Sequence, residues 1–170
     1  EQEYFLIDKN LYQKRKDLIF CNRTLFGAKP PKGQELEDHY YGAIKPRIVN
    51  FMKDLDEQLW KLGIPSKTKH NEVAPCQHEM APVFTTTNLA ADQNQLTMEI
   101  MKKVAQEHDM ICILHEKPFD GLNGSGKHNN WSVVTNTGIN LFKPGTDPIH
   151  NNAFLATLAC IVKGVDDFAD

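Results

Sequence analysis

The chain has 170 residues, of which 41% are hydrophobic, and it carries a formal charge of -3 at neutral pH. This length and hydrophobic content are enough for one globular domain with a substantial core. The charge gives no basic excess that would favour a nucleic-acid backbone, and no apolar run approaches the length of a membrane span. We therefore expect no nucleic-acid partner and no membrane partner.

The expected secondary structure follows the spacing of apolar residues along the chain. The residues EYFLID predict a strand, and a long polar loop that includes GAKPPKGQELED follows it. Apolar residues at helical spacing predict a helix from about His39 to Leu62, in which Pro46 either kinks the helix or marks its first turn.

Short extended segments and two more helices make up the rest of the chain. SKTKHNEVAP and EMAPVFTTT read as extended, a second helix is expected from Asp92 to His108, and MICILHE and HNNWSVVT predict strands. A third helix is expected from about Asn152 to the end. This order predicts an α+β fold, with a mixed, mostly antiparallel, curved sheet and helices packed on one side.

The four cysteines are scattered along the chain. Cys112 and Cys160 lie in the apolar runs MICILHE and LATLACIV, which predict buried, reduced thiols. This usage favours a reducing, cytoplasmic location over a disulfide framework.

The stretch GLNGSGKHNN, residues 121–130, comes close to the nucleotide-binding P-loop G-x-x-x-x-G-K-[ST]. His128 stands where the hydroxyl residue should be, and no helical pattern follows, so the P-loop interpretation fails. On a strand, His128, Asn130 and Ser132 would share one face and could line a polar pocket, with Trp131 and Val133 facing a core. A glycine-rich turn with a surface histidine is the alternative.

Two pairs of glutamates are spaced so that each pair can meet at one site. Glu1 and Glu3 are two apart on the first strand and face the same way. Glu72 and Glu79 bracket VAPCQH, where Pro75 makes a bend plausible. Hard carboxylate ligands of this kind suit Mg²⁺ or Mn²⁺.

Simpler interpretations of these glutamates stay open at this point. The first pair could lie on an exposed edge strand, and HNEVAPCQHE could be a polar hairpin. Zinc bound through His70, Cys76 and His78 is a third possibility, although H-x5-C-x-H matches no common structural zinc pattern.

Three stretches in this order, EQEYFLID, NEVAPCQHE and NGSGKHNNWS, resemble the catalytic domain of glutamine synthetases. Together with NRTLFGAKPPKGQELEDHYYGAIKPR, they most resemble the type III branch of bacterial enzymes. The resemblance covers essentially the whole chain. It implies an ATP-dependent glutamate–ammonia ligase that forms glutamine through γ-glutamyl phosphate, with glutamate, ammonia and ATP as partners.

The resemblance also implies a metal site. Glu3, Glu72 and Glu79 match carboxylates that hold one divalent ion, Mg²⁺ or Mn²⁺, near the amino-acid substrate. Glu1 and His128 match ligands of a second ion that bridges the ATP phosphates.

Four further positions carry implied substrate contacts. Asn123 and Gly124 match the loop that contacts the amino-acid substrate. Ser132 lines the nucleotide site in the family, and Asn130 lies where many members have histidine.

The resemblance covers only part of a complete enzyme. The chain opens inside a strand pattern without an initiator Met, and KGVDDFAD carries no helix stop signal. We expect residues 1–170 to be a partial catalytic domain, without the amino-terminal domain and the carboxy-terminal part, and inactive alone. The parent is expected to form a large homo-oligomeric ring. A related γ-glutamyl-amine ligase and a non-catalytic nucleotide- or metal-binding module of the same fold are the alternatives.

Overall fold

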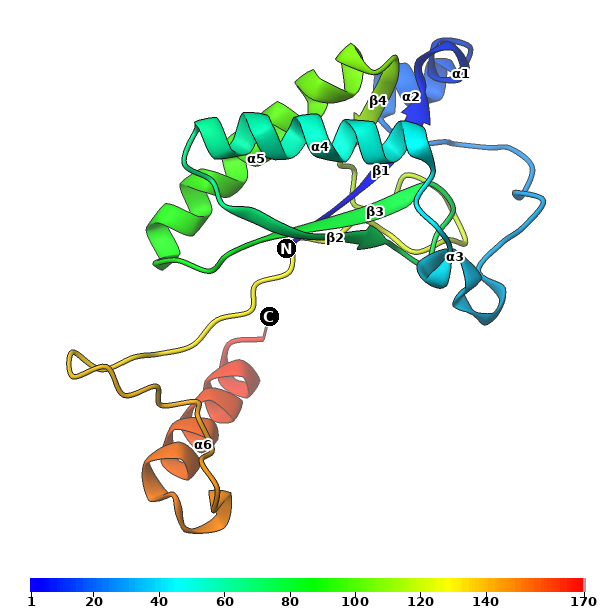
Figure 1. Ribbon diagram of the computed structural model, residues 1–170. Coiled ribbons are helices and arrows are strands. Elements are labelled where there is room, and N and C mark those ends of the chain that lie inside the picture. The colour runs from blue at the N-terminus through cyan, green and yellow to red at the C-terminus, as the bar shows by residue number, and fades with distance from the viewer. Residues whose placement is uncertain (170) are drawn as a thin grey trace. The chain divides into compact units, whose positions relative to one another are not determined.

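The computed structural model describes residues 1–169, and the chain divides into two compact units, Glu1–His128 and Asn129–Asp170. The first unit contains a four-stranded sheet in the order β2-β3-β1-β4 (Figure 1). All neighbouring strands in this sheet are antiparallel, which agrees with the prediction of a mixed, mostly antiparallel sheet. The α+β class is confirmed. The strand bounds are β1 Gln2–Asp8, β2 Ser66–Asn71, β3 Gln77–Pro82 and β4 Met110–Ile113.

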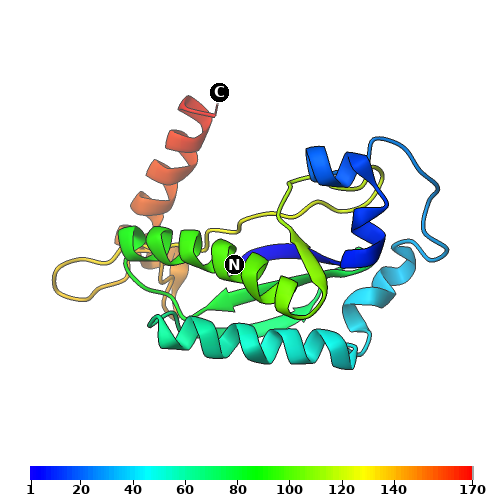
Figure 2. The same ribbon diagram turned by 90° about the horizontal axis from the view of Figure 1, so that it is seen from above.

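The two long helices of this unit, α4 (Pro46–Lys61) and α5 (Thr87–Glu107), cover one face of the sheet (Figures 1 and 2). Strand residues alternate between faces, so Tyr4 and Leu6 of β1 point into the core beneath these helices. Apolar residues recur at helical spacing on both helices and complete this core, among them Phe51, Met52, Leu55, Leu59, Met101 and Val104.

A smaller cluster covers part of the opposite face of the sheet. It joins Phe5 and Ile113 to Leu18 and Ala74, with Phe119 packed edge-on against Phe5. Leu18 belongs to α2 (Lys16–Cys21), which follows the short helix α1 (Lys9–Gln13). The amino-terminal end of β1 carries charged residues on this face, and the candidate site lies there.

The expected helix from His39 to Leu62 is broken in the structure. A 3₁₀ turn, Glu35–Glu37, and α3, Asp38–Tyr41, precede a break at Gly42, and α4 begins at Pro46. Proline disfavours helical geometry in the residue before it, and Lys45 is indeed extended. The first-turn interpretation of Pro46 is therefore confirmed, and the kink is wrong. Helices α1 and α2 fall inside the segment that was predicted as loop.

In the second unit, the strand predicted for HNNWSVVT is wrong. Within residues 129–169, Val134 forms only an isolated bridge with Asn140. Trp131 is 57% exposed and packs against Phe142, and Val133 is also exposed. These two side chains, which were expected to face a core, are therefore not buried in one. A strand needs a partner, and alternation along one segment does not reveal whether a partner exists.

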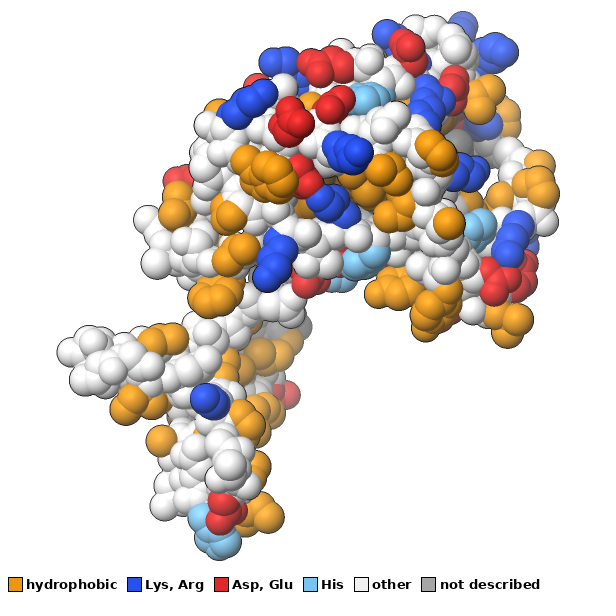
Figure 3. All heavy atoms as spheres, in the orientation of Figure 1, with side chains coloured by type: hydrophobic (Ala, Val, Ile, Leu, Met, Phe, Trp, Pro, Cys, Tyr) orange, Lys and Arg blue, Asp and Glu red, His pale blue; other side chains and the backbone are white. Residues whose placement is uncertain are grey.

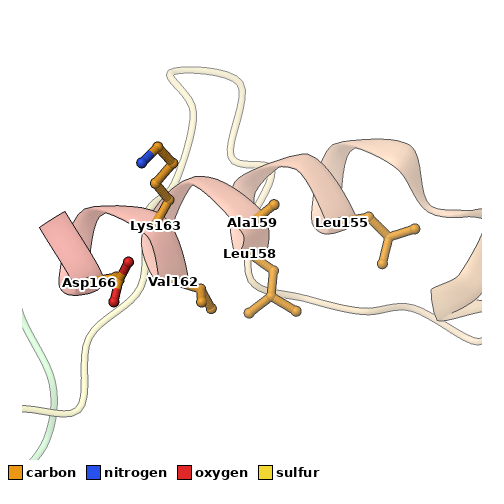
Figure 4. Close-up of a pocket in the computed structure, with 6 residues that line it drawn as sticks. All are labelled: Leu155, Leu158, Ala159, Val162, Lys163 and Asp166. Carbon is orange, nitrogen blue, oxygen red and sulfur yellow. The ribbon is translucent and has the colours of Figure 1, made fainter.

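Helix α6, Asn152–Asp167, confirms the third expected helix. Leu155, Leu158 and Val162 project from one side of it and help line a pocket (Figure 4). None of its described residues is buried, so the prediction of a buried thiol is wrong for Cys160, while Cys112 on β4 is buried.

The surface carries both signs of charge. On the face shown in Figure 3, basic and acidic side chains are interspersed over the unit that contains the sheet. Among the described residues, no helix is both long enough and apolar enough to span a bilayer.

The core beneath α4 makes the first prediction. Leu55 is 1% exposed, so Leu55→Ala should lower the free energy of unfolding by about 2–5 kcal/mol through lost burial and a residual cavity. Leu62 follows α4 and is 50% exposed, so Leu62→Ala should change it by less than about 1 kcal/mol. Urea titration measures both, and equal effects would contradict the assignment of this core.

Candidate metal and substrate site

The pairing of the strands brings together the carboxylates that the sequence singled out. Glu3 on β1 lies directly opposite Glu79 on β3, and Glu79 in turn lies opposite His70 on β2. Glu1 precedes β1 and Glu72 follows β2, each two residues from a member of this row. Because strand side chains alternate with a period of two, all five face the same side of the sheet.

His128 completes the cluster. It stands at the end of the glycine-rich segment 121–128, called the glycine loop below. Its Nδ1 lies 3.3 Å from Glu79 Oε2 and 3.5 Å from Glu1 Oε2, and its Nε2 lies 3.8 Å from Glu3 Oε1. The His128 side chain is 51% exposed, whereas that of Glu79 is 7% exposed. The structure thus gathers Glu1, Glu3, Glu72, Glu79 and His128 at one place, although their roles toward a metal stay a prediction.

His70 belongs to the same cluster, although the sequence indicated it only as a possible zinc ligand. Its Nε2 lies 3.1 Å from Glu79 Oε1, and its Nδ1 lies 3.4 Å from Glu72 Oε1. The two-residue spacing of His70 and Glu72 was the available signal, because it puts both on one face of a strand. Ligand atoms of His70, Glu72 and Glu79 lie within 4.8 Å of one another, as do those of Glu1, Glu79 and His128.

A tight hairpin turn returns Glu79 to Glu72. The Glu72 N–H donates to the Gln77 carbonyl at 2.9 Å, and the chain turns through Pro75 and Cys76. Cys76 has φ 61°, a left-handed conformation that few residues other than glycine adopt. Its carbonyl accepts the Leu6 N–H at 3.0 Å, so β1 holds the turn in place. The bend expected at Pro75 is confirmed.

The zinc interpretation is wrong for this arrangement. His78 lies on the face opposite Glu79, buried against the Tyr4 ring at 5.8 Å between centroids. Cys76 is exposed at the turn, and His70 faces the glutamates. Burial lowers the pKa of His78 to about 4, which keeps it neutral within the core.

The glycine loop is fastened to the start of β1 through its backbone. Gly126 accepts the Glu3 N–H at 3.0 Å and donates its own N–H to Glu3 Oε2 at 2.6 Å. The His128 N–H donates to the Glu1 carbonyl at 2.9 Å. Figure 1 shows the loop meeting the amino-terminal end of β1. His128 therefore reaches the carboxylates as a continuation of this backbone pairing.

One glycine in this loop has no room for a side chain. A Cβ on Gly124 would lie 2.1 Å from the carbonyl oxygen of Glu116, which accepts the Ser125 N–H at 2.9 Å. The Gly124 carbonyl accepts a hydrogen bond of 2.8 Å from the Gln77 side chain. Gly124 and Ser125 therefore tie the loop to β3 on one side and to Glu116, after the end of β4, on the other.

The remaining predicted contact residues separate into two groups. Asn123 lies in the same loop as Gly124 and pairs with Gln34 through two hydrogen bonds. Asn130 and Ser132 are exposed residues of the second unit, and their expected place beside His128 on one strand face is wrong because no strand forms there. Their nucleotide role stays a prediction.

The cluster holds more negative charge than its own residues neutralise. Burial raises the pKa of Glu72, and the charges of Glu3 and Glu79 raise it further. Burial also raises the pKa of Glu79, with the Glu1 carboxylate adding to it and His70 and His128 partly offsetting it. Both shifts mean that the ionised forms lack sufficient compensation.

One atom marks where compensation is missing. Glu79 Oε2 is buried and has no hydrogen-bond partner among residues 1–169. Unpartnered buried carboxylate oxygens are costly, and a divalent cation is the partner that a set of four carboxylates and imidazole suits. The residues present therefore fit Mg²⁺ or Mn²⁺.

A cavity adjoins the hairpin on this side of the molecule. Its volume is about 1060 Å³, and its lining includes Glu72, Cys76 and Gln77 from the hairpin, Leu122 from the glycine loop, and Lys32 from the long loop after α2. It gives the hairpin and the glycine loop an open neighbouring space of a size that small-molecule ligands occupy.

Residues 1–168 match the family model described as "Glutamine synthetase, catalytic domain". The chain belongs to the glutamine synthetase family. It is 65% identical over 169 residues to a glutamine synthetase of Butyrivibrio fibrisolvens, and the alignment covers 99% of this chain and 24% of that protein. It is 53% identical over 170 residues to the type-3 glutamine synthetase of Dictyostelium discoideum, and this alignment covers 100% of this chain and 23% of that protein.

This family member spans about a quarter of the length of those relatives. The expected resemblance to the type III branch is confirmed by the identity to the type-3 glutamine synthetase. A solved structure described as "Apo GmaS without ligand" matches with a TM-score of 0.57 and 25% identity, covering 82% of this chain and 30% of that chain.

Gly124 makes the second prediction. Gly124→Ala should displace the loop from Glu116 and lower the unfolding free energy by about 1–3 kcal/mol, as overpacking does. Gly164 lies inside α6 with nothing within 4 Å of an added Cβ, so Gly164→Ala should instead be neutral or stabilising. Thermal unfolding compares the two, and a neutral Gly124→Ala would show that the contact with Glu116 does not confine the loop.

The charge cluster makes the third prediction. A carboxyl whose folded pKa is raised stabilises the fold below its unfolded value, 4.5 for glutamate, and loses that contribution as the pH rises through the folded pKa. Glu79→Gln should therefore raise the Tm of the metal-free protein by about 2–5 °C at pH 7, and the gain should shrink toward pH 4. A gain that does not depend on pH would contradict the electrostatic origin.

Proposed function

We propose that this family member carries the metal-binding part of an ATP-dependent glutamate–ammonia ligase. The observation that carries the proposal is the convergence of four carboxylates and two imidazoles around a buried, unpartnered Glu79 Oε2. The high identity to proteins named glutamine synthetase supports the same reaction class. The proposal includes a cytoplasmic location, which the free cysteines favour.

The proposed reaction has two steps. The side-chain carboxylate of glutamate attacks the γ-phosphorus of ATP, which gives γ-glutamyl phosphate and releases ADP. Ammonia then attacks the acyl carbon, phosphate leaves, and a proton is lost to give glutamine. Both steps depend mainly on holding anions close together in a fixed orientation.

The residues of this chain would divide that task. Glu3, Glu72 and Glu79 would hold one divalent ion, and Glu1 and His128 would hold a second. Such ions, when bound, neutralise the repulsion between carboxylate and polyphosphate. His70, with Nε2 at 3.1 Å from Glu79 Oε1, would fix the orientation of that carboxylate and leave its other oxygen for a cation.

The glycine loop would contact the amino-acid substrate through Asn123 and Gly124, and Ser132 and Asn130 would contribute to the nucleotide site. The domain assignment belongs to the same proposal: residues 1–170 form part of a catalytic domain. The complete enzyme would form a ring of identical subunits.

The fourth prediction tests the metal site in the complete enzyme that contains these residues. Glu72→Gln and Glu79→Gln should each weaken Mn²⁺ binding, measured by calorimetry, by at least about tenfold and lower glutamine formation to a similar degree. Each substitution removes a carboxylate from the cluster and keeps the side-chain shape. Glu99 is exposed on α5, and Glu99→Gln should leave both quantities unchanged.

The same assay separates the alternatives. ADP release that requires glutamate and ammonia supports the proposed ligase, whereas release that requires an organic amine in place of ammonia would identify a γ-glutamyl-amine ligase. Mn²⁺ and nucleotide binding without turnover would identify a non-catalytic module. Mn²⁺ binding that is unchanged in Glu72→Gln and Glu79→Gln would overturn the metal site itself.

A further inference from the structure

A side chain from the long loop after α2 is hydrogen-bonded to the glycine loop at two points. Gln34 Oε1 accepts the backbone N–H of Asn123 at 2.7 Å, and Gln34 Nε2 donates to Asn123 Oδ1 at 3.0 Å. The two residues are 89 positions apart in the sequence. This pair joins the long loop after α2 to the glycine loop, which supplies His128.

The backbone N–H fixes which way both amides face. A backbone N–H can only donate, so the group of Gln34 that meets it must be the carbonyl oxygen. The amide nitrogen of Gln34 then faces the Asn123 side chain, and only Asn123 Oδ1 can accept from it. The NH₂ group of Asn123 is consequently turned away from Gln34.

Several backbone groups of this loop are already hydrogen-bonded to other parts of the protein. The Gly124 carbonyl is used by Gln77, the Ser125 N–H by Glu116, and both backbone groups of Gly126 by Glu3. Within residues 1–169, no hydrogen bond uses Asn123 Nδ2 or the Gly124 N–H. These two neighbouring donors, together with the buried Ser125 hydroxyl, which also has no partner within those residues, are left for a ligand. Donors of this kind suit a carboxylate group.

We propose that Gln34 is a positioning residue that orients the Asn123 amide so that its NH₂ group is presented to a carboxylate of the amino-acid substrate. This inference rests on the proposed function, because it takes the glycine loop as the amino-acid contact. Gln34 does not itself touch the reacting atoms. It selects one of the two amide orientations of Asn123, and the opposite one would place an oxygen against the substrate carboxylate.

The fifth prediction uses the substitution Gln34→Glu in the complete enzyme. A carboxylate at this position still accepts the Asn123 N–H, but it can no longer donate, so the Asn123 side chain must turn its NH₂ group toward it. Two hydrogen bonds remain, and the Tm should change little. The KM for glutamate should rise about tenfold, while kcat and the KM for ATP stay within about twofold.

Two companions separate orientation from general effects. Gln106 is exposed near the end of α5, and Gln106→Glu adds the same charge and should leave the KM for glutamate unchanged. In an Asn123→Ala background, Gln34→Glu should have no further effect on that KM, because the amide it reorients is gone.

Each outcome decides the inference. An active wild type with an unchanged KM for glutamate in Gln34→Glu would overturn the positioning role and leave the proposed function intact. An equal rise in the Asn123→Ala background would also overturn it, because the effect would not pass through Asn123. A complete wild-type enzyme with no glutamate-dependent turnover would overturn both the proposed function and this inference.

Discussion

The antiparallel pairing of β1 with β3 is the constraint on which the rest of the site depends. Its register sets Glu3 against Glu79, and like charges directly opposite each other on a sheet destabilise it. The strands cannot shift by one residue to escape, because Tyr4 and Met80 would then leave the core beneath α4 and α5. The fold therefore holds an anionic pair together by burying apolar surface on the other face.

The surrounding groups stabilise some of these carboxylate oxygens and leave one of them without a hydrogen-bond partner. Gly126 donates to Glu3, and His70 lies close to one oxygen of Glu79. The second oxygen of Glu79 keeps no hydrogen-bond partner within the described residues, and it faces His128 at 3.3 Å. In the proposed function such a site would be preorganised for a cation, because strands and a backbone-anchored loop place its side chains independently of any ion.

The sequence predicted the structure correctly where a local rule determines it. It failed where the structure depends on contacts with residues that are distant in the sequence. The bend expected at Pro75 predicted that Glu72 and Glu79 can meet, and the structure agrees. The same alternation predicted a strand over residues 128–135, but within residues 1–169 no neighbouring strand pairs with it. The sequence indicated His70 only as a possible zinc ligand and gave no signal for Gln34, because their partners, Glu79 and Asn123, are distant in the sequence.

The strands that carry the carboxylates also form the wall of the apolar core. Tyr4 and Glu3 are neighbours in the chain and point to opposite sides of the same sheet, as do His78 and Glu79. A repacking of the core would tilt these strands and alter the spacing of the charged groups behind them. In the proposed metal site, ion preference could therefore be altered by apolar substitutions alone, at positions that do not contact the ion.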